Sequence, residues 1–67
     1  MQIDPQEGLN YVLSELNDQN VEVRRNAVIT CIKIGDPAVV DPLIALLKDE
    51  DFEVRFYAKQ GVKRLKK

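Results

Sequence analysis

The 67-residue chain contains no histidine, no tryptophan and a single cysteine, Cys31. Without histidine it can supply neither a His-based catalytic triad nor a His-containing metal site. One cysteine cannot form an internal disulfide, and it cannot build a zinc or iron–sulfur centre. A glycine-rich phosphate loop is also missing. We therefore expect a protein that is not an enzyme and has no metal and no cofactor.

Long apolar runs and charge of one sign are absent as well. No apolar segment approaches the roughly 20 residues that span a bilayer, and residues 1–8 lack the basic and apolar regions of a signal peptide. A net charge of −1 gives no global case for nucleic acid or an anionic membrane. At 45% hydrophobic residues the chain is too apolar for disorder. We expect one small cytoplasmic domain, residues 1–67, with no membrane partner.

The main positive feature is an internal repeat. The segment Asp18-Gln19-Asn20-Val21-Glu22-Val23-Arg24-Arg25-Asn26-Ala27 returns 31 residues later as Asp49-Glu50-Asp51-Phe52-Glu53-Val54-Arg55-Phe56-Tyr57-Ala58. Asp, Glu, Val, Arg and Ala recur at identical spacing. A period near 30 with helical spacing of apolar residues is typical of stacked helix pairs.

Capping and stop signals predict two helices in each repeat. In the first repeat, Asp4-Pro5 begins a helix that ends near Asn17, and Asn20 caps a second helix that stops at Gly35. The connections are short, so consecutive helices should pack antiparallel.

In the second repeat, Asp36-Pro37 restarts the chain as a third helix. Pro42 should either bend its first turn or move its true start to about Asp41. A fourth helix is expected from Phe52 to Leu65, with Asp51 as its N-cap.

These units resemble the HEAT repeat, in particular the short variety named after phycobilisome lyases. The resemblance implies an all-α, α-α superhelix fold, with two HEAT-like hairpins of about residues 4–34 and 36–67 forming a four-helix mini-solenoid. It also implies that Asp18 and Asp49 accept backbone N–H groups at the turns, and that Arg24 and Arg55 tie neighbouring units together. Arg24 has a following unit to reach, whereas Arg55 has none.

The two ends of the array differ from its middle. Val28 and Ile32, which face the second unit, correspond to Lys59 and Lys63, and Lys67 continues that stripe. At the other end, Glu15 stands where the second unit has Leu46. Because terminal repeats need polar outer faces, this pattern predicts a finished two-repeat object. Tyr57 and Gly61 should face the first unit, where glycine permits close approach.

Charge is unevenly distributed along the chain. Residues 1–23 contain five acids and no bases, and residues 55–67 contain six bases and no acids. Each run could be a solvated face. Alternatively, the acidic front and basic rear could attract each other between chains and give a homo-oligomer, by head-to-tail association or as a domain-swapped dimer.

A helical wheel gathers a mixed basic, aliphatic and aromatic row on the second helices of the two units: Arg25, Ile29, Lys33, Phe56, Gln60 and Arg64. Such a row is typical of a protein-binding hot spot. We expect a non-enzymatic interaction or scaffold module whose partner is another protein, such as an acidic helix or peptide. In the alternative interpretation, Ile29 and Phe56 only shield the edge of the core.

Two other functions are weaker alternatives. Nucleic acid could be bound by the basic C-terminal helix, where Phe56 and Tyr57 could stack on bases; its basic residues are Arg55, Lys59, Lys63, Arg64, Lys66 and Lys67. An accessory role in a lyase-like complex would need a larger assembly, because two units form too little concavity to enclose a ligand.

Overall fold

The computed structural model describes residues 5–66, and every regular element in that range is helical. The elements are α1 (Pro5–Glu15), α2 (Val21–Ile34), a 3₁₀ turn (Pro37–Val39), α3 (Val40–Ala45), a second 3₁₀ turn (Leu46–Lys48) and α4 (Phe52–Leu65). The predicted all-α fold is confirmed. The expected N-cap Asp4 lies outside the described residues. No helix in this range combines the length and apolar character needed to cross a bilayer.

Local capping explains why α2 and α4 have the limits predicted for them. The Asn20 side chain accepts a hydrogen bond from the Glu22 N–H at 2.9 Å, and the Asp51 carboxylate accepts one from the Val54 N–H at 2.9 Å. Gly35 ends α2 in the left-handed conformation, with φ of 69°, and donates its N–H to the Cys31 carbonyl. Because these signals depend on neighbouring residues alone, they are readable from sequence.

The third helix is less regular than a single continuous element. Asp36 accepts a hydrogen bond from the Ala38 N–H at 2.8 Å, but the first turn is 3₁₀ and α-helical geometry begins at Val40. Pro42 has no N–H to donate to the carbonyl four residues before it, so an α-helical ladder cannot extend back through this turn. Of the two effects predicted for Pro42, the first turn is indeed irregular, and the α-helix begins one residue before Asp41.

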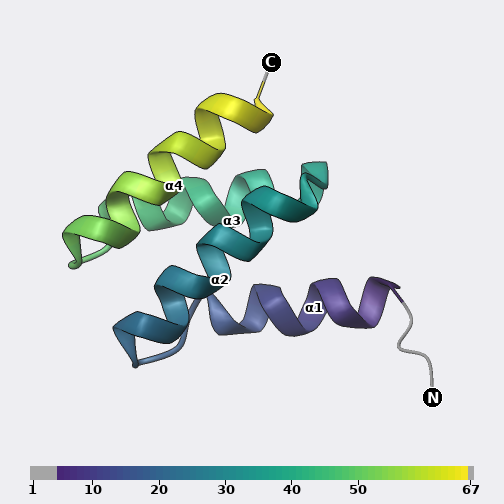
Figure 1. The fold of residues 1–67 in the computed structure, drawn as a ribbon, viewed down its shortest axis with the longest axis horizontal. Coiled ribbons are helices and arrows are strands. Elements are labelled where there is room, and N and C mark those ends of the chain that lie inside the picture. Colours follow the sequence, from purple (N-terminus) through teal and green to yellow (C-terminus); the bar gives the residue numbers. More distant parts are fainter. Residues whose placement is uncertain (1–4, 67) are drawn as a thin grey trace.

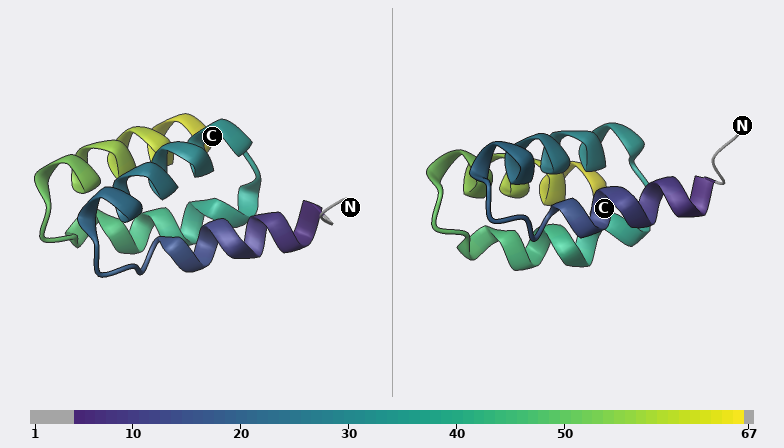
Figure 2. Two further views of the ribbon diagram at one scale, coloured as in Figure 1. Left: turned by 60° about the horizontal axis from the view of Figure 1, so that its bottom comes forward. Right: turned by 90° about the horizontal axis from the view of Figure 1, so that it is seen from below.

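The helices form two layers, with α1 and α3 in one and α2 and α4 in the other (Figures 1 and 2). Consecutive helices run antiparallel, so each hairpin contributes one helix to each layer. The turns within the two hairpins lie at the same end of the molecule, and the link between hairpins lies at the opposite end (Figure 2). This arrangement places α2 and α4 side by side along one face.

One apolar cluster lies between the layers and joins the hairpins. Its members are Leu9, Leu16, Ala27, Val28, Cys31, Val39, Leu43, Leu46, Val54 and Ala58. Val28 is fully buried as predicted, whereas Ile32 is only partly buried and packs against the edge of the cluster. Gly61 is buried against Ile32, as predicted for a close approach between α4 and the first hairpin.

The outer end of the second hairpin is more apolar than its lysines suggested. Lys59 and Lys63 are exposed, but Leu47 is also 36% exposed and Phe52 is 70% exposed. The counterpart of Leu47 in the first hairpin is Leu16, which is only 2% exposed. The leucine at this repeat position is thus buried between the two hairpins but exposed at the outer end of the second one.

The third helix is buried along a narrow stripe only. Ile44 is 38% exposed, and Ala45 is exposed as well. Leu46 follows the prediction and belongs to the core, while its counterpart Glu15 is half-buried. The burial of this helix is therefore confined to a narrower stripe than its composition indicated.

Candidate protein-binding groove

A groove of about 540 Å³ runs between α2 and α4. From α2 it is lined by Ile29, Ile32 and Lys33, and from α4 by Phe56, Tyr57, Gln60, Lys63 and Arg64. The two helices lie side by side in all three ribbon views (Figures 1 and 2). Side chains four residues apart share a helix face, so Ile29 and Lys33 line one wall together. The other wall is formed in the same way by residues of α4.

Five of the six residues predicted from the helical wheel line this groove. The exception is Arg25, whose Nη1 lies 3.0 Å from Oε1 of Glu53 in an ion pair that spans the hairpins. Helical periodicity places Arg25 on the correct side of α2 but gives no information about a carboxylate from the other hairpin. Its guanidinium is consequently held by Glu53 and does not line the groove.

Three lining residues were not included in the predicted row. The sequence pattern places Ile32 on the face toward the second unit, Lys63 on the exposed stripe at the outer end, and Tyr57 on the side that faces the first hairpin. Each lies at the boundary between the two surfaces, because α2 and α4 approach closely at Gly61. On a helical wheel these three residues lie directly beside the predicted row, and this position is the sequence signal that could have identified them.

An aromatic pair forms part of the groove. The Phe56 and Tyr57 rings meet edge to face, with centroids 5.4 Å apart and an interplanar angle of 77°. Tyr57 packs against the core, whereas Phe56 is 47% exposed and lies outside the core cluster. The Phe56 ring is thus held from one side by Tyr57 and is open to solvent from the other.

All charged side chains that line the groove in the described part of the chain are basic. Lys33, Lys63 and Arg64 belong to its lining, and no acidic residue from the described part of the chain does. The rest of the lining is aliphatic, aromatic or uncharged. A ligand that complements this surface must therefore present apolar groups together with negative charge.

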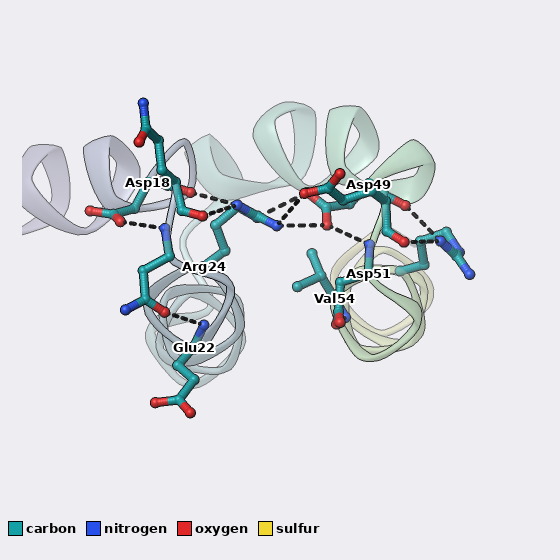
Figure 3. Close-up of polar contacts among 10 residues, drawn as sticks. Asp18, Glu22, Arg24, Asp49, Asp51 and Val54 are labelled. Carbon is teal, nitrogen blue, oxygen red and sulfur yellow. Dashed lines mark hydrogen bonds and ion pairs between the residues drawn. The ribbon is translucent and has the colours of Figure 1, made fainter.

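A second polar arrangement lies at the seam between the hairpins (Figure 3). Nη1 of Arg24 donates to the carbonyls of Asp18 and Gln19 in its own hairpin, at 2.7 and 3.1 Å. Its Nε lies 3.1 Å from Oδ1 of Asp49 in the other hairpin, within ion-pair range although not aligned as a hydrogen bond. Nη2 also pairs with Glu50 at 3.5 Å. Arg24 is 8% exposed, so this guanidinium works as a buried connector.

The aspartates at the two turns hold backbone N–H groups. Asp18 accepts from the Asn20 N–H at 2.8 Å, and Asp49 accepts from the Asp51 N–H at 2.9 Å. Arg55 donates to the carbonyls of Asp49 and Glu50 within its own hairpin. Its contacts therefore repeat only the part of the Arg24 pattern that lies inside one unit.

Groups with chemical reactivity are few in the described range. Cys31 is fully buried, and burial raises the pKa of its thiol, which disfavours the nucleophilic thiolate. Within residues 5–66, no group of three or more carboxylates or thiols could hold a metal ion. The Asp49 and Asp51 carboxylates instead serve the turn and the N-cap of α4.

Comparison with known protein families identifies the repeat. A family model described as HEAT repeats matches residues 9–66. A search of curated proteins found no match to this sequence. The matched segment begins within α1 and includes the rest of both hairpins, the groove and the Arg24 seam.

Proposed function

The chain belongs to the HEAT-repeat family, and from this premise we propose that it is a protein-binding module whose groove takes an acidic amphipathic helix. HEAT repeats commonly mediate protein–protein interaction or scaffolding, and the family is generally non-catalytic. The proposed binding surface is the groove between α2 and α4. The observation that supports an acidic partner is that the charged residues in the described lining of the groove are all basic.

The apolar part of the groove supports an amphipathic partner. Ile29 is half-buried, Phe56 is half-exposed, and the edge-to-face contact with Tyr57 restrains the Phe56 ring before binding. A ring that is already ordered loses little conformational entropy when a ligand packs on it. Aliphatic side chains spaced by three and four residues on one helix face could pack along this row.

The basic part of the groove supports an acidic partner. Lys33 lies on the α2 wall, and Lys63 and Arg64 lie on the α4 wall, so a bound helix would meet positive charge from both sides. These exposed charges would favour encounter and orientation more than they would add affinity. Binding should therefore weaken as salt concentration rises.

The test uses a fluorescently labelled synthetic peptide with leucines on one helix face and glutamates elsewhere. Fluorescence anisotropy should show saturable binding, and a peptide of the same composition with scrambled order should bind much more weakly. Phe56→Ala combined with Arg64→Ala should abolish the signal while circular dichroism remains helical. Tyr11→Ala is the matched control, because Tyr11 is 67% exposed on α1 and does not line the groove.

Three results would reject this function. Equal binding of the ordered and scrambled peptides would show charge attraction without a site. Retained binding by the double variant would show that the groove is not the site. Displacement of the peptide by a short single-stranded oligonucleotide at lower concentration would reassign the surface to nucleic acid.

A further inference from the structure

The seam between the two hairpins provides a template for contacts at the open ends. Arg24 holds the Asp18 and Gln19 carbonyls on one side and reaches Asp49 and Glu50 of the next unit on the other. It is therefore a two-sided connector, with an inner set of contacts to its own turn and an outer set to the following hairpin (Figure 3).

Arg55 occupies the equivalent position in the second hairpin and makes only the contacts to its own turn. Its Nη1 donates to the Asp49 carbonyl at 2.8 Å and to the Glu50 carbonyl at 3.0 Å. Among residues 5–66, no carboxylate lies within ion-pair distance of this guanidinium. The side of Arg55 that corresponds to the outer contacts of Arg24 is thus without an anionic partner in the described range.

Two residues of the surface around Arg55 have counterparts that are buried at the seam. A hollow of about 440 Å³ is lined by Leu47, Phe52, Arg55, Phe56 and Lys59. In the first hairpin the counterparts of Leu47 and Arg55 are Leu16 and Arg24, which are 2% and 8% exposed beneath the second hairpin.

The opposite end of the molecule carries the complementary charges. Asp18 is the counterpart of Asp49. It is exposed, and its Oδ1 accepts only the local Asn20 N–H among the hydrogen bonds of the described residues. Glu15 is the counterpart of Leu46. Exposed Tyr11 lies one helical turn before Glu15 on α1, and it therefore lies on the same side of that helix.

Lys59 and Glu15 form a second pair of opposite charges at the two ends of the molecule. At the seam, Val28 of the first hairpin and Leu46 of the second belong to the same buried cluster. Lys59 and Glu15 replace them at the two open ends. Two positions that are apolar and buried inside the molecule thus carry opposite charges at the two ends.

We propose that a second copy of the chain stacks on the outer face of the second hairpin through its own first hairpin. In this arrangement Arg55 of one copy pairs with Asp18 of the next, and Lys59 faces Glu15. The two faces are different, so the contact is head-to-tail and can repeat as a filament or close as a ring. The two ion pairs lie at exposed ends of the molecule, so association should weaken as salt concentration rises.

Sedimentation velocity with a charge swap tests this proposal. The wild-type sedimentation coefficient should rise with concentration at low salt and return to the monomer value at moderate salt. Lys59→Glu alone brings two carboxylates together at the junction, and Glu15→Lys alone brings two ammonium groups together, so each variant should remain monomeric. An equimolar mixture of the two variants restores opposite charges at this contact and should recover association. None of the ion pairs within the described chain involves Lys59 or Glu15, so both variants should keep wild-type circular dichroism.

Two further variants make the test specific. Asp18→Asn retains an acceptor for the Asn20 N–H but removes the charge that Arg55 would meet, so association should weaken. Lys33→Glu changes net charge as much as Lys59→Glu but lies in the groove, so it should leave association intact and reduce only binding of the acidic peptide. Self-association and peptide binding can therefore fail independently.

The proposal is overturned if the wild-type chain sediments as a monomer at every concentration and salt level. It is also overturned if Lys59→Glu associates like the wild type, if the mixture fails to recover association, or if Lys33→Glu abolishes it.

Discussion

Nε of Arg24 in the first hairpin lies 3.1 Å from Oδ1 of Asp49 in the second, and both side chains are only 10% exposed. This pair joins the units at the end where both hairpin turns lie (Figure 3). Asp49 also accepts the Asp51 N–H, so one carboxylate orders its own turn and receives the connector from the neighbouring unit. The contact thus links the first turn of α2 to the turn that precedes α4.

Arg24→Ala should lower the free energy of unfolding by about 3 kcal/mol, because it leaves Asp49 without its cation and two carbonyls without a donor. Arg55→Ala is the matched control, since it removes an equivalent side chain that makes hydrogen bonds within one hairpin only. Its cost should be about 1 kcal/mol. Urea denaturation followed by circular dichroism measures both. Equal losses would contradict a connecting role for Arg24.

Gly61→Ala should destabilise the protein although alanine is the better helix former. A Cβ at this position would lie 2.8 Å from Cγ1 of Ile32 and 2.9 Å from Cδ1 of Leu43. The overpacking costs about 1–3 kcal/mol and outweighs the gain of about 1 kcal/mol in helix propensity. A net loss of about 1 kcal/mol is expected. In the background of Ile32→Ala the same substitution should cost less, and a double-mutant cycle without such coupling would argue against the close contact.

How well each part of the fold could be predicted depends on how close in sequence the residues that determine it lie. The ends of α2 and α4 depend on caps within a few residues, which is why Asn20, Gly35 and Asp51 identified them. The 3₁₀ turns around α3 and the exposure of Ile44 depend on geometry that periodicity does not encode. An apolar stripe shows which helix face is buried but not how completely the next element covers it.

Cys31 should react slowly with thiol reagents in the native protein. Its side chain is fully buried, and burial raises the pKa of the thiol, so both access and thiolate population are low. Reaction with Ellman's reagent at neutral pH should proceed only through opening of the fold and should become fast in denaturant. A native rate close to the denatured rate would contradict the placement of α2 in the core.

Glu53→Gln should strengthen binding of the acidic peptide. The substitution removes a negative charge beside the groove and frees Arg25, which now pairs with Glu53 at 3.0 Å. This ion pair is partly exposed, so its loss should cost no more than about 1 kcal/mol of stability. Fluorescence anisotropy at low salt should show a lower Kd than for the wild type. An unchanged or higher Kd would indicate that positive charge around the groove does not select the ligand.

The candidate site was predictable where it depends on one helix and not where it depends on two. Ile29 and Lys33 follow from the spacing in α2, and Phe56 and Arg64 follow from that in α4. The capture of Arg25 by Glu53 depends on how far one hairpin is shifted along the other. That shift is fixed by packing between residues distant in sequence, and the wheel of a single helix contains no information about it.

The groove itself is tested most directly by chemical-shift mapping of the ¹⁵N-labelled chain during titration with the acidic amphipathic peptide. The largest amide shifts should occur in α2 around Ile29 and Lys33 and in α4 around Phe56 and Gln60, with little change in α1. Shifts concentrated on α1 and α3, or no shifts under conditions where the chain remains folded, would contradict the proposed binding surface.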